Sequence, residues 1–482
     1  MLDEIKQIKL KKLENLKAAG METYPEKTER SMTNQKALDD FDKLQGKEIS
    51  LVGRVKSLRP MGGSCFSHIE DGSGKIQLFL NQNNIAAEKY KLFLDNIELG
   101  DFIEARGKLF KTQTGEKTLE VRDWKIAAKS LAPVPTEYFG LKDTEELLRR
   151  RYLDLMMNAE TRELFRKKNI FWQTTRNFLA KKGFLEVQTP VFENIPGGAD
   201  AEPFVTRHNA LGRDYFMRIS LELPLKKMQV GGYEKVFEIG RVFRNEGIDR
   251  EHLQEYDTVE FYSAYTNLRE GMKLTKKIFQ EVVKKVAGKM ETAHGAETIR
   301  WDGKWETKDY FKIFKAETGI DLSKDISVED LKKKADGLKI EYKPEYGKGR
   351  MVDLLFKKVI RPKMVQPCFL VGHPIEVSPL AKRDPKNAKK VLRMQVIAGG
   401  TEMANGFSEL NDPIDQRSRF EEQMKLREAG DKEAQRLDED FVEALEYGMP
   451  PAFGLGISER LFAFLMGKSV RETVIFPPMR GK

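Results

Sequence analysis

Two apolar, β-prone runs near the middle of the chain are separated by a polar loop. The first run covers residues 233–239, and the second covers 258–262. Runs rich in aromatic and β-branched residues predict strands, and two of them joined by one long loop predict an antiparallel pair. Such a pair would place Arg244, Glu246 and Glu260 on one concave surface. This surface is suited to a nucleotide, because Arg can hold a phosphate through two hydrogen bonds and Glu can accept from an amino group.

The whole chain is long enough for several domains. Its 482 residues predict two or three domains, and 40% hydrophobic with 33% charged residues is typical of a soluble globular protein. No long apolar run occurs, so no membrane span is expected, and the acids near the N-terminus are unlike a signal peptide. Cys65 and Cys368 are expected to be free thiols in a reducing cytoplasm. The net charge of +9 favours a polyanionic partner.

Residues 1–47 are expected to form an N-terminal helix and a lead-in to the first domain. Within 1–19, apolar residues recur near helical spacing, and Gly20 is a plausible stop. The simpler interpretation is a docking helix with a solvated lysine face, and the alternative is a helix that also touches nucleic acid.

Residues 48–130 contain five strand-like runs, with a helical run between the third and the fourth. The strands are expected at 49–57, 64–70, 75–81, 102–111 and 117–127, and the helix at 85–96. Asp71 to Gly74 form a hairpin turn signal between the second and third strands. This layout predicts an OB-fold, a five-stranded β-barrel, and a plain barrel of other use is the alternative that the pattern leaves open.

A hinge at 131–144, marked by Pro133 and Pro135, is expected before a second domain at 145–482. Helices and aromatic strands alternate there without a regular βαβ repeat, which predicts an antiparallel sheet flanked by helices and an α+β class overall. The lysine-rich segment at about 271–360 is expected to be a helical insertion.

The common phosphate-binding loops are absent from the sequence. Residues 467–469 read Gly-Lys-Ser, but Phe462 stands where a P-loop needs its first glycine. No Gly-x-Gly-x-x-Gly opens a βαβ unit either. A bound nucleotide would therefore be held by side chains, chiefly arginines, and by metal.

Several segments, in their order along the chain, resemble one enzyme family. They are 183–190, similar to motif 1 of the class II aminoacyl-tRNA synthetases, 243–247, similar to motif 2, 454–460, similar to motif 3, and 195–199, 376–381 and 402–412, which resemble lysyl-tRNA synthetases in particular. The resemblance runs from about residue 45 to the C-terminus. It implies an OB-fold anticodon-binding domain, a class II catalytic domain, a cytoplasmic homodimer, and tRNA(Lys), L-lysine and ATP as partners.

The resemblance also implies a lysine pocket. Its residues would be Gly198, Glu222, Arg244, Glu260, Tyr262, Asn405, Phe407 and Glu409. Glu222 would bind the α-ammonium, and Glu260 and Glu409 the ε-ammonium. This composition makes physical sense, because a buried cation must be paired with an acid. An aspartate pocket would need a basic residue instead.

The ATP site implied by the resemblance lies on the strand pair described first. Its residues would be Arg244, Glu246, His252, Tyr256, Glu402 and Arg460. Arg244 and Arg460 would be catalytic, and Glu402 would hold Mg²⁺. The implied reaction is attack of the lysine carboxylate on the α-phosphate of ATP, which needs positioning and charge stabilisation and no general base.

Three positions depart from the family pattern. Gln395 stands where the family often has a second metal-binding Glu, and an amide is a weaker ligand for Mg²⁺. The loop at 252–257 differs from the usual motif 2 loop, although Tyr256 can still stack on an adenine. Motif 3 is one residue shorter than usual before Arg460, with Ser458 near the place of a glycine.

On the predicted barrel, Arg59, Phe66, Gln77 and Glu116 match the family positions that read the central base of the anticodon. Phe66 would stack on the base, and Gln77 and Glu116 would hydrogen-bond to its edge. A place in the barrel core is the alternative for Phe66.

The implied function is ATP-dependent attachment of lysine to tRNA(Lys) through a lysyl-adenylate. Three alternatives stand beside it. The first is an aspartyl- or asparaginyl-type ligase, which shares the architecture. The second is a non-catalytic tRNA-binding paralogue, which Gln395 and the short motif 3 support. The third is a single-strand binder with an OB-fold and an unrelated second domain, which does not account for residues 405–412.

Overall fold

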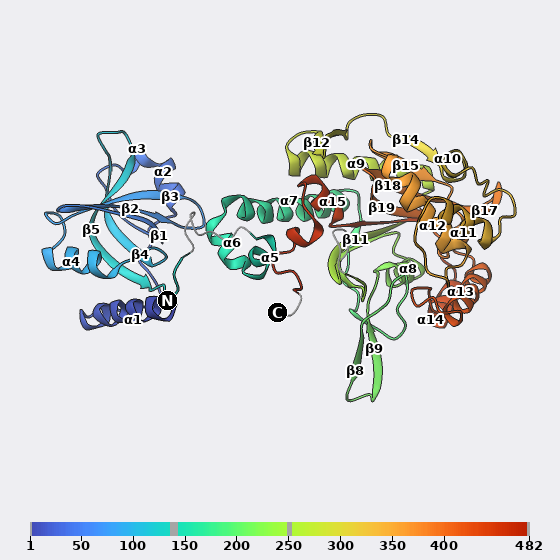
Figure 1. Ribbon diagram of the computed structural model, residues 1–482, viewed down its shortest axis with the longest axis horizontal. Coiled ribbons are helices and arrows are strands. Elements are labelled where there is room, and N and C mark those ends of the chain that lie inside the picture. The colour runs from blue at the N-terminus through green and yellow to red at the C-terminus, as the bar shows by residue number, and fades with distance from the viewer. Residues whose placement is uncertain (1, 135–142, 248–252, 480–482) are drawn as a thin grey trace. The chain divides into compact units, whose positions relative to one another are not determined.

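A computed structural model describes residues 2–134, 143–247 and 253–479 (Figure 1). The chain divides into two compact units, 1–142 and 143–482. Both cysteines are buried free thiols. None of the helices in the described residues is long and apolar enough to cross a membrane.

The first unit is built on a closed five-stranded barrel, in the order β1-β2-β3-β5-β4. Its elements are β1 (Glu48–Met61), β2 (Ser64–Glu70), β3 (Lys75–Asn81), α4 (Ala87–Asn96), β4 (Phe102–Lys111) and β5 (Lys117–Ala128). The tight turn after Glu70 sets the register of β2 and β3, in which Glu70 pairs with Lys75. The OB-fold prediction is therefore confirmed, with its helix between the third and fourth strands.

The N-terminal helix α1 (Leu2–Ala18) belongs to the same unit, together with α2 (Asn34–Asp39) and α3 (Phe41–Leu44). Leu13 and Leu16 of α1 are buried, but Ile8 is 57% exposed, so not every apolar residue of the periodic pattern belongs to the packed face. Two lysines of α1 form ion pairs with Glu98, at 3.3 Å from Lys9 and 2.9 Å from Lys12. These contacts fit the docking interpretation of the helix.

The second unit is organised around an eight-stranded sheet in the order β14-β15-β18-β19-β20-β11-β10-β6. The strands are β6 (Leu185–Glu186), β10 (Lys235–Phe243), β11 (Glu255–Ala264), β14 (Glu306–Asp309), β15 (Cys368–Val371), β18 (Arg393–Ala398), β19 (Thr401–Ser408) and β20 (Ala452–Ser458). All neighbours are antiparallel except β14 with β15 and β10 with β6. The expected antiparallel sheet is present.

Smaller strands and the helices surround this sheet. The strands are β7 (Phe192–Glu193), β8 (Val205–His208), β9 (Arg213–Met217), β12 (Glu291–His294), β13 (Glu297–Arg300), β16 (Arg383–Asp384) and β17 (Asn387–Val391). The helices are α5 (Thr144–Arg149), α6 (Arg151–Met157), α7 (Ala159–Lys181), α8 (Glu222–Val230), α9 (Leu268–Ala287), α10 (Tyr310–Thr318), α11 (Val328–Gly337), α12 (Lys348–Leu355), α13 (Pro413–Glu428), α14 (Glu439–Glu446) and α15 (Arg460–Leu465).

The segment expected as a helical insertion, 271–360, is only partly helical. It contains α10, α11 and α12, with the Ser327 side chain capping the start of α11. It also contains β14, which extends the main sheet, and the β12–β13 pair. Most of α9 lies within it as well, and that helix packs its apolar face into the central core. The lysine-rich composition of the segment gave no sign of these strands. Their partners in the sheet and core are distant in sequence, so no local pattern predicts them.

The two faces of the main sheet have different roles. Helices α7 and α9 cover one face, where their apolar side chains pack against Val259 and Phe261 of β11 (Figure 1). Because side chains alternate along a strand, Glu260 and Tyr262 point to the other face, toward α8. The polar side chains of β11 that were predicted for the site thus lie on the face of the sheet opposite α7 and α9.

Candidate active site

The strand pair β10–β11 carries the first part of the site. The two strands pair as predicted, with Val242 opposite Tyr256. Just beyond β10, the backbone N–H of Arg244 donates to the carbonyl of Gln254 at 2.8 Å, and the Gln254 side chain donates to the carbonyl of Glu246 at 3.0 Å. These bonds hold Arg244 and Glu246 at the wall of a cavity of about 930 Å³.

Other predicted residues line the same cavity. They are Tyr256, Gln395, Glu402 and Arg460. The guanidinium of Arg244 lies 5.5 Å from the centre of the Tyr256 ring. Arg460 is the first residue of α15, directly after β20, and its Nη1 donates to the carbonyl of Glu402 at 3.3 Å. Among the predicted residues, the cavity therefore gathers two arginines, an aromatic ring and two acids, groups that can hold the phosphates and the base of a nucleotide.

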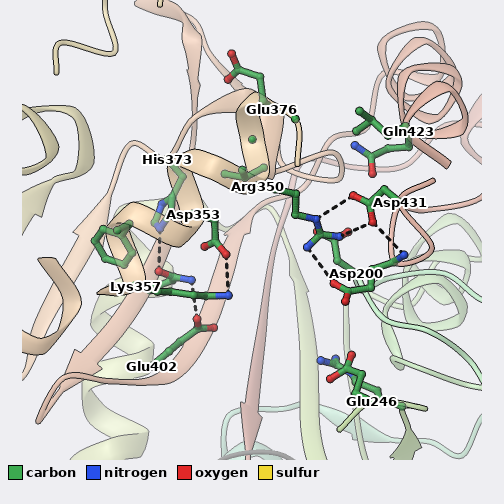
Figure 2. Close-up of a pocket in the computed structure, with 18 of the residues that line it drawn as sticks. Asp200, Glu246, Arg350, Asp353, Lys357, His373, Glu376, Glu402, Gln423 and Asp431 are labelled. Carbon is green, nitrogen blue, oxygen red and sulfur yellow. Dashed lines mark hydrogen bonds and ion pairs between the residues drawn. The ribbon is translucent and has the colours of Figure 1, made fainter. Parts of the chain in front are cut away.

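Gln395 forms a bridge between His373 and Glu402. Its side-chain oxygen lies 3.1 Å from Nε2 of His373, and its amide nitrogen donates to Oε2 of Glu402 at 2.8 Å. Burial lowers the pKa of His373 to about 3, so the ring is neutral and its Nε2–H can donate to the amide oxygen. Figure 2 shows His373 and Glu402 on the two sides of this bridge.

This bridge limits what the cavity can offer to a metal ion. The amide oxygen of Gln395 already accepts from His373, which leaves Glu402 as the carboxylate at this position. Within the described parts of the chain, no three His, Cys, Asp or Glu side chains form a metal cluster. The residues fit a Mg²⁺ ion held by one carboxylate together with substrate phosphates, which is a usual way for proteins to bind Mg²⁺.

The acids predicted for the lysine pocket form a second group, buried beside the cavity. Glu260 accepts from the Ser220 hydroxyl at 2.9 Å, from the backbone N–H of Leu221 at 3.0 Å and from the Tyr262 hydroxyl at 3.1 Å. Burial raises the pKa of this carboxyl despite these donors. Three hydrogen bonds, two from the segment before α8 and one from β11, thus orient the Glu260 carboxylate.

Glu222 and Glu409 lie around a residue that the sequence had not singled out, Lys226. Its Nζ is 2.6 Å from Oε1 of Glu222 and 2.5 Å from Oε2 of Glu409. The Phe407 ring centre is 5.5 Å from the same nitrogen. Burial raises the pKa of Glu222 to about 7 and that of Glu409 well above its ordinary value.

Glycines permit this close packing. A Cβ at residue 454 would lie 2.1 Å from Oε1 of Glu409 and 2.4 Å from Cε1 of Tyr262. Gly198 has a φ of +86°, and a Cβ there would lie 2.9 Å from the Cβ of Glu222. The predicted residue Gly198 is therefore in contact with the acid group, and any side chain at 454 would displace Glu409 or Tyr262.

Comparison with known proteins places this arrangement in a family. The model described as "tRNA synthetases class II (D, K and N)" matches residues 143–480, and "OB-fold nucleic acid binding domain" matches residues 49–127. Proteins named lysine–tRNA ligase from Pelotomaculum thermopropionicum, Roseiflexus sp. RS-1 and Halalkalibacterium halodurans are 41%, 42% and 41% identical. These matches cover 100% of this chain and 96%, 99% and 98% of the relatives.

The chain belongs to the lysine–tRNA ligase family of class II synthetases. In this class II synthetase, Asn405 does not line the cavity but contacts a residue that does. Its side-chain oxygen accepts from Nε of the cavity residue Arg393 at 2.7 Å. The predicted residue His252 lies outside the described residues. The remaining predicted lysine-site residues are collected near the cavity, but only Arg244 among them lines it.

Sequence reasoning missed several charged residues of this synthetase. Lys226 was detectable in principle, since it lies four residues after Glu222 and shares its helix face. Arg350 of α12 reaches across the cavity to bond both carboxylate oxygens of Asp431, at 2.9 and 3.1 Å (Figure 2). Asp200 also lines the cavity, and burial raises its pKa. No local pattern distinguishes these last three residues from ordinary surface charges.

On the barrel of the synthetase, three of the four predicted anticodon residues lie on the neighbouring strands β1, β2 and β3, and Glu116 lies in the loop just before β5. Phe66 pairs with Arg59 of β1 on one side and with Phe79 of β3 on the other. Cys65, Ser67 and Ile69 are the buried residues of β2, so alternation puts the half-buried Phe66 outside the barrel core.

Each of the other two residues predicted to read the anticodon makes a polar contact within the barrel. Gln77 donates to Thr118 at 2.9 Å, and Glu116 lies 3.1 Å from Nε2 of His68. His68 lies two residues after Phe66 on β2 and is a direct register partner of Gln77. Phe66, Gln77 and Glu116 therefore lie in one region of the barrel, although Gln77 is buried there.

Proposed function

We propose that the chain is a lysine–tRNA ligase that forms lysyl-adenylate and transfers the lysyl group to tRNA(Lys). The observation that carries this proposal is the buried acid group beside the cavity. Three carboxyls, Glu222, Glu260 and Glu409, meet there, and Lys226 is the one ammonium within ion-pair distance among the described residues. A group with excess negative charge and no spare cation suits a substrate with two ammonium groups.

The nearby guanidinium groups support lysine over aspartate. Arg244 donates through Nε to the carbonyl of Ile219 at 3.2 Å. Arg393 donates to the side chain of Asn405 and, at 2.7 Å, to the carbonyl of Val377. Neither forms an ion pair with the three acids. An acidic substrate side chain would therefore face carboxylates, which disfavours the aspartyl-type alternative.

The cavity residues would activate the substrate by position and charge. Arg244 would bind the α-phosphate and the attacking carboxylate, and Arg460 would hold the distal phosphates. Glu246 would accept from the adenine amino group, and Tyr256 would stack on the ring. Glu402 would hold Mg²⁺, which when bound neutralises phosphate charge. The nucleophile is already a carboxylate, so no general base is required.

A homodimer is part of the proposal. β6 is an edge strand of the main sheet, and an unpaired edge is a ready site for pairing. Exposed apolar side chains gather in the same stretch of chain: Leu185 47%, Val191 36%, Phe192 57%, Val205 58% and Leu211 57% exposed. A second copy that packs on 185–211 would cover them. The reduced thiols Cys65 and Cys368 fit the cytoplasm as the compartment.

ATP–pyrophosphate exchange with a panel of amino acids tests the activity. Lysine should stimulate exchange, and analogues without the distal amine should be rejected by roughly ten-thousand-fold, since the acids would stay unpaired. Exchange with aspartate or asparagine in place of lysine would establish the rival ligase. Binding of tRNA without exchange for any amino acid would establish the non-catalytic paralogue, which the single metal-binding acid favours.

A further inference from the structure

Lys226 occupies the centre of the acid group and is fully buried. Its side chain has 0% exposure, and its ammonium lies within hydrogen-bond length of two carboxylates that come from distant parts of the chain. Glu222 precedes it by one helical turn on α8, whereas Glu409 directly follows β19. A lysine is seldom so deeply buried unless it is paired, so its partners explain its place.

Aromatic rings complete the surroundings of the ammonium. The ring centre of Phe407, from β19, is 5.5 Å from Nζ, and that of Phe441, from α14, is 5.7 Å away. Rings at these distances stabilise a cation and exclude water. The ammonium is therefore bound by two acids and otherwise surrounded by aromatic rings. This one cation sets the orientation of both carboxylates.

The other titratable groups around this centre are acids, a phenol and one guanidinium. From β11, Glu260 and the Tyr262 hydroxyl face Glu222 and Glu409. After burial, the charge of Glu260 raises the pKa of both carboxyls, whereas burial and the three acids raise the pKa of Tyr262 well above its ordinary value, so the phenol stays neutral. From β18, the guanidinium of Arg393 acts on Glu222 in the opposite sense. Three buried carboxyls that repel one another electrostatically would not all stay ionised without a cation among them.

We propose that Lys226 is a positioning residue for amino acid binding: its ammonium keeps the carboxylates of Glu222 and Glu409 ionised and side by side, ready to accept the ammonium groups of the substrate. The inference rests on the proposed function and adds a determinant of its specificity. An ionised carboxylate accepts from an ammonium group, whereas a protonated carboxyl offers a donor to it. Without Lys226, the acids would take up protons, and the affinity for lysine would fall.

The test is the lysine requirement of the full-length protein, measured by pyrophosphate exchange between pH 6 and 9. Lys226→Met keeps an unbranched apolar stem between the two rings and removes the charge. Its KM for lysine should rise by about 10- to 100-fold near pH 7, because the acids lose their charge-assisted partner. Its KM for ATP should stay within about twofold of the wild-type value.

The pH profile separates positioning from simple packing. In the wild type, the KM for lysine should fall as pH rises, since the acids ionise and bind cations better. In Lys226→Met, this fall should move to higher pH by about one unit or more. Lys226→Arg retains the charge and should keep the wild-type profile, although its larger head raises the KM.

Lys227→Met is the matched control. Lys227 is the next residue on α8 and pairs with Asp440 near the surface, so its loss should leave the lysine profile unchanged. A lysine KM and pH profile of Lys226→Met equal to those of Lys227→Met would overturn the inference. A parallel loss for ATP and lysine would also overturn it, because that points to general damage.

Two further outcomes keep the test decisive. If Lys226→Met fails to fold, Lys226→Arg carries the test alone: a lost pH dependence in this charge-retaining variant would overturn the inference. If the wild type shows no exchange with lysine, the proposed function fails, and the inference fails with it. If the wild type exchanges with lysine, and Lys226→Met has the same lysine KM and pH profile as the wild type, the inference is refuted while the proposed function stands.

Discussion

The side-chain amide of Gln395 donates a hydrogen bond to Oε2 of Glu402 at 2.8 Å, in the wall of the cavity. Gln395 is 8% exposed, and its oxygen is taken by His373. An amide in this position orients the carboxylate without adding a second negative charge. Gln395, which replaces a Glu of the family pattern, is thus hydrogen-bonded into the cavity wall. It leaves one carboxylate fewer for Mg²⁺ at this position.

Replacement of Gln395 by Glu should make stability depend on Mg²⁺. A buried carboxyl at 395 would lie beside the half-buried carboxyl of Glu402 and repel it, so the variant should lose about 1–3 kcal/mol of unfolding free energy without metal. Addition of Mg²⁺ with ATP should restore the unfolding free energy of the variant. The variant should also reach half-maximal exchange at a lower Mg²⁺ concentration than the wild type. Thermal unfolding and Mg²⁺ titration measure both effects. Gln395→Met is the control: it adds no charge, so it should lose stability whether or not Mg²⁺ is present. Identical Mg²⁺ titrations for the wild type and Gln395→Glu would contradict this prediction.

Replacement of Glu260 by Gln should weaken lysine binding selectively. The amide keeps the size of the side chain but removes the charge that would face the substrate ammonium. The KM for lysine in pyrophosphate exchange should rise by about 10- to 100-fold, with the KM for ATP little changed. Glu255→Gln is the control, since Glu255 lies at the start of the same strand and pairs with Arg241 at 3.5 Å. Equal lysine KM values in the two variants would refute a binding role for Glu260.

Replacement of Phe66 by Ala should weaken tRNA charging and spare adenylate formation. Stacking of a base on an aromatic ring is worth about 1–3 kcal/mol, so the KM for tRNA should rise by roughly 5- to 150-fold. Aminoacylation and pyrophosphate exchange, measured side by side, separate the two steps. Phe102→Ala on β4, where the ring lies 4.3 Å from the Arg54 guanidinium, is the control. A Phe66→Ala protein with both activities reduced alike would argue against base stacking.

Glu459 should make the unfolding free energy fall as pH rises. Burial raises the pKa of this carboxyl to about 7, although Lys168 lies 2.5 Å away and acts against the shift. The folded state therefore binds a proton more tightly than the unfolded state, so the contribution is complete below about pH 4.5 and is lost as pH rises through about 7. The loss is roughly 3 kcal/mol at most.

Denaturant unfolding at several pH values between 5 and 8 measures this contribution. Glu459→Gln keeps a hydrogen-bonding oxygen for Lys168 and cannot titrate, so its unfolding free energy should fall less over this range. Glu443→Gln, on the last-but-one helix α14, should retain the wild-type pH dependence, because this exposed acid is outside the buried pair. Parallel curves for the wild type and Glu459→Gln would show that Glu459 does not titrate in this window.

Much of the architecture follows from local sequence. Buried and half-buried residues alternate along β2, and the turn after Glu70 sets the register of β2 and β3, so this hairpin could be predicted from residue alternation and the turn sequence. The pairing of β10 with β11 follows in the same way, because the two strands are neighbours along the chain. In contrast, β14 and α9 join the main sheet and its core through partners distant in sequence, which no local pattern in 271–360 reveals.

The residue types of the site could be predicted from local sequence: Arg244 and Glu246 after β10, Glu260 on β11, and Glu409 after β19. The balance of their charges could not be predicted, because it depends on how distant segments pack together. The tertiary structure brings Lys226 between Glu222 and Glu409, and it joins His373 to Glu402 through Gln395. The physical reason is that a buried charge is set by its nearest partners in space, and here those partners come from segments far apart in the chain.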